Sequence, residues 1–202
     1  MRYENWIRRL ETRVGSVVGV NGGIDAVRRP LYLPMRADHL PDFVLPLRVV
    51  EQGQRVVFCP DAVSHEEALQ RPEDEFRMRV RVSLRALHAL FDMRRLLSPR
   101  YGLFAFQLLV HKVLRYLVFA FLAGALIANA FVLEEPEYRI TLALQLAFYG
   151  WALVGILLPG SEKIRGLALP FLFLSTNVAW AVAFFKFLRG DRQVTWVPRK
   201  GG

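Results

Sequence analysis

Three long apolar runs occupy the C-terminal part of the chain. They extend over residues 114–133, 140–158 and 167–188, and short polar breaks separate them. Each run is close to the ~20 residues that an α-helix needs to cross the hydrocarbon core of a bilayer. The pattern therefore predicts three transmembrane helices. Three polar residues inside them, Asn129, Gln145 and Asn177, are expected to form hydrogen bonds between helices.

Two amphipathic helices are predicted before these runs. Residues 2–14 place Trp6, Leu10 and Val14 on one helical face, and Gly15 ends the helix. A longer helix begins at Pro72 and reaches about residue 97, with acidic residues in its first turn, where they suit the helix dipole. Its apolar stripe runs beside a basic stripe formed by Arg77, Arg81, Arg85 and His88. Such a helix is typical of a membrane surface.

Short runs rich in β-branched residues predict three strands in the front part of the chain. They cover residues 17–20, 24–27 and 55–59, with glycine or proline nearby to end them. Residues 42–52 are predicted to be helical in spite of Pro46. The chain then divides into residues 1–71, an interfacial region at 72–113, a transmembrane region at 114–188 and a basic tail at 189–202.

The net charge of +9 requires an explanation. Nucleic acid is not the expected partner, because the sequence has no zinc-finger spacing and no RNA-binding aromatic motif. Basic residues beside apolar runs instead face anionic lipid headgroups on the cytoplasmic side. Those before the first run, among them Lys112 and Arg115, predict a cytoplasmic front part. Three spans would place the tail outside, although it carries Arg189 and Arg192, against the positive-inside rule.

Most standard catalytic signatures are absent from the sequence. It contains no Walker phosphate loop, no serine nucleophile elbow and no HExxH zinc pair. The four histidines lie in four different segments, so they predict no metal site. Cys59 is the only cysteine, which excludes an intrachain disulfide and a thiolate cluster.

Three features remain as possible sites of chemistry. Asp42 lies in an apolar stretch, where an acid is either a general base with a raised pKa or a helix cap. The stripe of Arg77, Arg81 and Arg85 either binds a diphosphate or attracts lipid headgroups. The pair Gly22-Gly23 either lets a sugar approach the backbone closely or forms an ordinary turn.

The order of these pieces resembles the C-terminal half of a family 2 membrane glycosyltransferase of the GT-A type. The family includes the cellulose, hyaluronan and poly-N-acetylglucosamine synthases. The matching pieces, in chain order, are Glu4…Trp6…Arg9…Glu11, Gly15…Gly19…Gly22-Gly23, Arg28-Arg29, Asp42-Phe43, Gly53…Arg55-Val56-Val57-Phe58, Ala62…Glu66, Phe76-Arg77…Val80-Arg81-Val82, His111-Lys112-Val113-Leu114-Arg115, Pro170…Phe173…Asn177…Ala179 and Trp196…Pro198…Arg199.

The resemblance implies a fold and roles for particular residues. The fold is an α/β protein: part of a Rossmann-like GT-A sheet, then an amphipathic interfacial helix and three transmembrane helices, with helix predominating. Asp42 matches the base that deprotonates the acceptor, and Arg81 matches the arginine near the donor's diphosphate. Met78 and Val82 depart from the family's Q-x-x-R-W motif, which argues against processive polymer synthesis. Pro41 replaces the acid that usually precedes the base.

The implied reaction is inverting transfer of a sugar from a nucleotide-sugar to a glycan or lipid-linked acceptor. The family binds Mg²⁺ or Mn²⁺ through an Asp-x-Asp motif, and this chain has none, so the metal ligands and the nucleotide-binding half are expected elsewhere. The expected location is the bacterial inner membrane, in cell-envelope polysaccharide biosynthesis. The alternative is a non-catalytic subunit that anchors or assembles an envelope polysaccharide complex.

Overall fold

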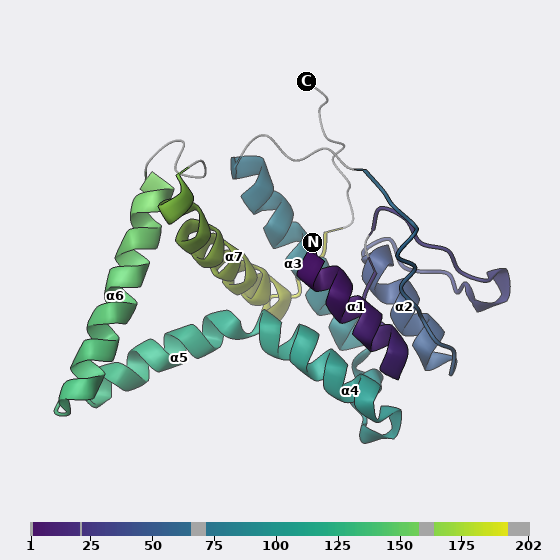
Figure 1. The fold of residues 1–202 in the computed structure, drawn as a ribbon, viewed down its shortest axis with the longest axis horizontal. Helices are drawn as coiled ribbons and strands as arrows, with labels where there is room; N and C mark the ends of the chain where they lie inside the picture. Colours follow the sequence, from purple (N-terminus) through teal and green to yellow (C-terminus); the bar gives the residue numbers. More distant parts are fainter. Residues whose placement is uncertain (1, 21, 66–71, 158–163, 194–202) are drawn as a thin grey trace.

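A computed structural model describes residues 2–20, 22–65, 72–157 and 164–193, which are mostly helical (Figure 1). The α-helices are α1 (Arg2–Val14), α2 (Pro41–Glu51), α3 (Pro72–Asp92), α4 (Leu103–Leu108), α5 (Val118–Phe131), α6 (Pro136–Leu157) and α7 (Arg165–Leu188). Three short 3-10 turns are η1 (Arg29–Leu31), η2 (Arg94–Leu97) and η3 (Pro99–Tyr101), and η4 (Leu109–Leu114) is π-helical. Of the predicted tail, residues 189–193 lie within the described part. The Trp196…Pro198…Arg199 motif lies outside it.

The predicted α/β sheet is wrong, because the described residues contain no β-strand. Residues 17–20 and 55–59 do lie beside each other, and the Val17 N–H donates to the Val56 carbonyl (3.0 Å). A ladder needs such bonds to repeat along both segments. Here the Val56 N–H donates to Ser16 Oγ (3.2 Å) and the Phe58 N–H to Thr12 Oγ1 (2.9 Å). The N–H groups of Val56 and Phe58 therefore donate to side chains and are not available to the backbone of a partner strand.

Helix α1 ends at Val14, as predicted, and Arg55 caps it. The Arg55 guanidinium donates to the carbonyls of Thr12 (2.6 Å) and Gly15 (2.8 and 3.1 Å). The last carbonyls of a helix lack partners within it, so these bonds stabilise its end. The apolar stripe of α1 stays exposed in the structure, and the helix turns Glu11 inward instead.

The core lies between α2, α3 and α7. Its members are Val44 and Leu47 from α2, Leu84 and Leu90 from α3, and Ala179 and Ala183 from α7, joined by Leu96 and Leu108. Helix α3 packs along α7 with the same direction (Figure 1). Arg79 donates to Thr176 Oγ1 (3.0 Å), and the ring of His88 meets that of Phe187 edge-on with centroids 4.9 Å apart. The basic helix therefore lies against a hydrophobic helix.

Within residues 2–20, 22–65, 72–157 and 164–193, two helices are long and apolar enough to cross a membrane: α6, and α7 from Gly166 onward. The prediction of three spans is wrong. The first predicted run becomes α5, whose 14 residues span about 21 Å, against the ~30 Å of a bilayer core. The chain bends by 62° between residues 103–114 and α5. Charged Lys112 and Arg115 lie in and beside η4, at this bend.

The polar residues of the apolar helices behave in two ways. Asn129 of α5 donates to Gln145 Oε1 of α6 (3.2 Å), so the predicted bond between helices is confirmed for this pair. Asn177 instead donates to the Phe173 carbonyl of its own helix (2.9 Å). Helices α6 and α7 approach closely at Gly155, where a Cβ would lie 3.1 Å from Cβ of Phe171.

Candidate functional site

Asp42 lies in the first turn of α2, and it is not the helix cap. The cap position is taken by Leu40, and Pro41 is the first helical residue. The helix has no side-chain hydrogen bond at its cap. Proline suits this start because the first N–H groups of a helix have no partner within it. The carboxyl group of Asp42 is thus left for other contacts.

The carboxyl group of Asp42 is incompletely satisfied. Its Oδ1 is buried and accepts no hydrogen bond from the described residues. Burial raises the pKa of the Asp42 carboxyl above its ordinary value of 3.8, although Lys112 and Arg85 act in the opposite direction. A raised pKa makes the carboxylate a better proton acceptor. The residue as a whole is half-buried, and its Oδ2 faces Gly22.

Gly22 lies directly against Asp42. A Cβ at Gly22 would lie 3.3 Å from Oδ2 of Asp42 and 3.6 Å from its Cγ. The Val20 N–H donates to the Asp42 carbonyl (3.3 Å), which holds the loop beside the helix. Gly23 follows in an exposed turn. The structure thus brings together the predicted base and the first of the two predicted glycines, leaving open backbone beside the carboxylate.

Lys112 of η4 completes the surroundings of Asp42. Its ammonium lies 4.8 Å from the centre of the Phe43 ring, in a cation–π contact. A Cβ at Gly19 would lie 3.0 Å from Lys112 Nζ, so the absence of a side chain there makes room for the ammonium. Lys112 had no role at the site in the sequence interpretation: it served to orient the chain and belonged to the matching piece His111–Arg115. A signal for a further role is its place within the apolar stretch 103–131, in a segment that forms a π-helix.

Arg85 of α3 holds the loop that leads to Asp42. Its guanidinium donates to the backbone carbonyls of Ala37 (3.3 Å), Asp38 (3.1 Å) and His39. Burial lowers the pKa of Arg85, and the charge of Arg81 one turn earlier lowers it further. Arg81, a predicted phosphate ligand, therefore lies close to the Asp42 site.

The other predicted phosphate ligand, Arg77, is exposed on α3 a further turn away. Among the described residues it takes no part in the contacts that surround Asp42. The two arginines differ in exposure: Arg81 is half-buried, whereas Arg77 is exposed.

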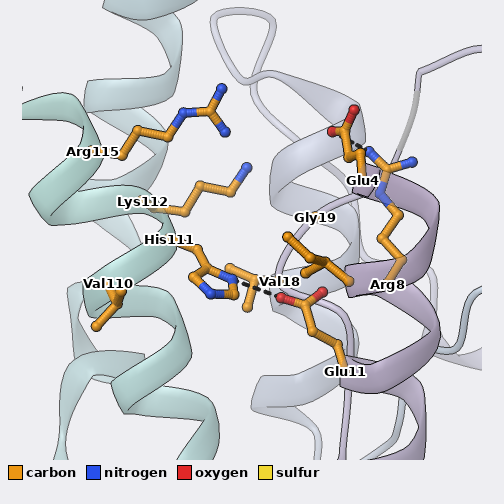
Figure 2. A pocket seen from close by; sticks show the side chains of 10 residues that line it. Glu4, Arg8, Glu11, Val18, Gly19, Val110, His111, Lys112 and Arg115 are labelled. Carbon is orange, nitrogen blue, oxygen red and sulfur yellow. Dashed lines mark hydrogen bonds and ion pairs between the residues drawn. The ribbon is translucent and has the colours of Figure 1, made fainter. Parts of the chain in front are cut away.

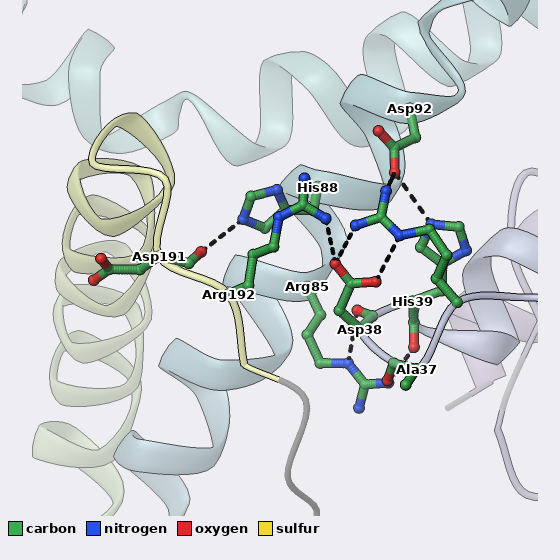
Figure 3. Close-up of polar contacts among 9 residues, drawn as sticks. Ala37, Asp38, His39, Arg85, His88, Asp92, Asp191 and Arg192 are labelled. Atoms are coloured by element: carbon green, nitrogen blue, oxygen red, sulfur yellow. Dashed lines mark hydrogen bonds and ion pairs between the residues drawn. The ribbon is translucent and has the colours of Figure 1, made fainter.

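Asp38 ties the loop before α2 to the end of α7 (Figure 3). This buried carboxylate accepts bonds from Arg36 (3.0 and 2.5 Å) and from Arg192 (2.8 Å). Burial alone would raise the pKa of Asp38, but the hydrogen bond and charge of Arg36 outweigh it and hold the pKa below 3.8. Arg192 follows α7, so this contact joins the chain after α7 to the loop before α2.

Further contacts extend this network. Asp92 accepts from Arg36 (3.2 Å) and lies 3.1 Å from the ring nitrogen Nε2 of His39. His88 Nε2 lies 2.8 Å from the Asp191 carbonyl, again joining α3 to the chain after α7 (Figure 3). The loop that positions Asp42 is thus held from α3 and from beyond α7.

A pocket of about 270 Å³ lies between α1 and η4 (Figure 2), and we call it the α1–η4 pocket. Its lining is Glu4, Ile7, Arg8, Glu11, Val18, Gly19, Val110, His111, Lys112 and Arg115. An ion pair of Arg8 with Glu4 (2.9 Å) and a hydrogen bond between His111 Nδ1 and Glu11 (2.7 Å) cross or border it. Lys112 belongs both to this pocket and to the surroundings of Asp42.

Within the described residues, no group of three or more His, Cys, Asp or Glu side chains is arranged to hold a metal ion. The residues present therefore do not fit the Mg²⁺ or Mn²⁺ that the family resemblance implies. No family model, no curated protein and no solved structure matches this chain.

Proposed function

We propose that this chain is the acceptor-side part of a membrane-bound glycosyltransferase in which Asp42 is the general base. One observation carries the proposal: Asp42 has a buried oxygen without a hydrogen-bond partner among the described residues, and burial raises its pKa. The oxygens of a carboxylate that only caps a helix would accept hydrogen bonds from backbone N–H groups. Asp42 keeps a lone pair free instead, beside the open backbone of Gly22.

The proposed step is an inverting displacement. Asp42 accepts the proton of the acceptor's hydroxyl group while that oxygen forms a bond to the anomeric carbon of the donor sugar. The bond from this carbon to the diphosphate breaks, and the nucleoside diphosphate leaves with the electron pair. General-base catalysis typically increases the rate of such an attack by about 10²- to 10⁴-fold. No step is assigned to a metal ion, because the described residues hold no ligand set for one.

The remaining residues have supporting roles in this proposal. Gly22 and Gly23 carry no side chain, so their backbone is available to a sugar, and a Cβ at Gly22 would crowd Oδ2 of Asp42. Arg81 contributes positive charge on the side of the donor's diphosphate. The nucleotide-sugar and its metal ion are bound by a separate nucleotide-binding part. The acceptor is a glycan or a lipid-linked sugar, delivered at the membrane by α6 and α7.

The proposed location is the bacterial inner membrane, with residues 1–116 on the cytoplasmic side. The basic residues at the bend before α5 support this orientation, since Lys and Arg are retained on the cytoplasmic side of spans. Cell-envelope polysaccharide synthesis is the process that fits a transferase of this kind. A non-catalytic anchor or assembly subunit is the alternative that the experiment must separate.

The decisive experiment measures sugar transfer in membranes that contain the chain together with its nucleotide-binding part. Asp42→Asn preserves the shape of the side chain and removes the base, so transfer should fall by about 10²- to 10⁴-fold. Asp61→Asn is the matched control, because Asp61 is an exposed aspartate away from the site. Equal turnover of both variants would favour the anchoring role, since an anchor needs no base.

A further inference from the structure

The charges that line the α1–η4 pocket do not balance. Glu4 is paired with Arg8, and Glu11 is paired with His111. Lys112 and Arg115 remain, and within the described part of the chain neither forms an ion pair with a carboxylate. Lys112 is acted on by the charges of Asp42 and Glu11 without forming an ion pair with either, and its repulsion by Arg115 at the same cavity favours a bound anion.

The two cations are presented on one face. Lys112 and Arg115 lie three positions apart on helical backbone, a spacing at which side chains are neighbours. Both side chains extend from the η4 side toward α1 (Figure 2). The missing side chain of Gly19 makes room for the Lys112 ammonium, and the Phe43 ring lies beneath it. The ammonium is thus positioned by its surroundings, which reduces the entropy lost on binding a ligand.

The pocket also lies at the start of an apolar helix. Helix α5 begins at Val118, directly after Arg115 and a short break. Its side chains are largely exposed, including Phe121 and Ile127. A molecule with an anionic head in the pocket can therefore lay an apolar chain along α5. Exposed apolar surface beside a cationic pocket fits an amphiphilic ligand.

We propose that the α1–η4 pocket binds a phosphate group, with Lys112 and Arg115 as its cationic contacts. Arginine matches phosphate oxygens with two parallel N–H donors, and lysine adds a compact charge. The phosphate belongs to a lipid headgroup or to a free phosphate, and both share the chemistry that these residues recognise. This site goes beyond the proposed transfer reaction, because it uses neither the base nor the donor.

The test measures binding of phosphatidic acid to the full chain in neutral detergent by native mass spectrometry. Lys112→Gln and Arg115→Gln should each weaken the apparent Kd by about tenfold, as expected for loss of one charge-assisted contact. Arg13→Gln is the control, because it removes an exposed arginine of α1 that does not line the pocket. It should change the Kd by less than about twofold, the size of a general charge effect.

Competition identifies the source of the phosphate. If inorganic phosphate displaces the lipid, the pocket takes a free phosphate; if it does not, the lipid is the ligand. Arg115 is exposed, so its variant tests the site even where Lys112→Gln disturbs folding. Asp42→Asn should abolish transfer without weakening lipid binding, which separates this proposal from the glycosyltransferase. Equal Kd values for the pocket variants and Arg13→Gln would overturn the site.

Discussion

Asp38 accepts hydrogen bonds from two arginines, whereas Asp42, one helical turn later in the sequence, has a buried oxygen with no partner among the described residues. The arginine contacts hold the pKa of Asp38 below 3.8, and burial raises that of Asp42 above it. Two carboxyl groups four residues apart thus have opposite environments. Asp38 fastens the loop before α2, and Asp42 is the group that we propose as the base.

Gly22→Ala should impair transfer by crowding the base. The added Cβ would meet Oδ2 of Asp42 at 3.3 Å, so the carboxylate or the loop must shift by a few tenths of an ångström. Misplacement of a catalytic group costs about 10- to 100-fold in rate. Gly15→Ala is the control, since a Cβ there meets nothing within 4 Å. Rates of sugar transfer in membranes compare the two, and equal rates would show that Gly22 is only a turn residue.

Asp42→Asn should stabilise the fold at neutral pH. A carboxyl group whose pKa is raised on folding binds protons more readily in the folded state, so its contribution to stability falls as pH rises from 3.8 to the folded pKa. The asparagine variant does not pay this penalty and should unfold at a higher temperature than the wild type at pH 7. Below pH 3.8 the two should converge. Thermal unfolding followed by tryptophan fluorescence measures this difference, and a constant offset at all pH values would contradict it.

Asp38→Asn should destabilise the fold. Removing one member of a buried ion pair costs about 3–5 kcal/mol, and the half-exposed Arg36 and Arg192 reduce this to about 1–3 kcal/mol. The pKa of Asp38 is lowered on folding, so its contribution is present above pH 3.8 and is lost as pH falls through the folded value. The variant should therefore differ from wild type at pH 7 and approach it in acid.

Unfolding of Asp38→Asn and of Asp61→Asn in the same detergent gives the comparison for this prediction. Asp61 is exposed, so its loss should change the free energy of unfolding by less than about 0.5 kcal/mol. A small effect at Asp38 would mean that the contact to Arg192 does not hold the end of α7.

Cysteine labelling tests the arrangement in the membrane. Two spans return the chain to its starting side, in agreement with the contact of Arg192 with Asp38 (2.8 Å). Glu134, before α6, and the exposed Cys59 should then lie on the same side. The wild type is labelled at Cys59, and a Cys59→Ser, Glu134→Cys double variant is labelled at position 134. An impermeant thiol reagent should label both proteins to the same extent, in intact cells and again after lysis. Opposite accessibility would indicate three spans.

With two spans, the basic residues after α7 lie on the same side as the basic front part. The conflict with the positive-inside rule that three spans created then disappears. The error came from the length of the first apolar run, since hydropathy averages over a window and does not register a bend. Lys112 and Arg115, inside and beside η4, marked the point at which the helix breaks.

Local pattern was enough to predict α1, the start of α3 and the two helices that are long and apolar enough to cross a membrane. Amphipathic spacing, Pro72 and Gly15 set α1 and α3, and long apolar runs set α6 and α7, because propensity, capping and hydropathy act between near neighbours. Asp42 was singled out as an acid in an apolar stretch. These features depend on residues a few positions apart, and such residues are visible in the sequence.

Only the tertiary structure decided that the described residues form no sheet, what surrounds Asp42, and that a pocket lies between α1 and η4. Strand runs need a partner with a matching ladder, and here Ser16 and Thr12 take the donors of residues 55–59. Lys112 reaches Phe43 and Gly19 only because the fold places η4 beside α2 and the segment after α1. Such contacts join residues far apart in the chain, and their energies depend on burial and distance, which no local pattern specifies.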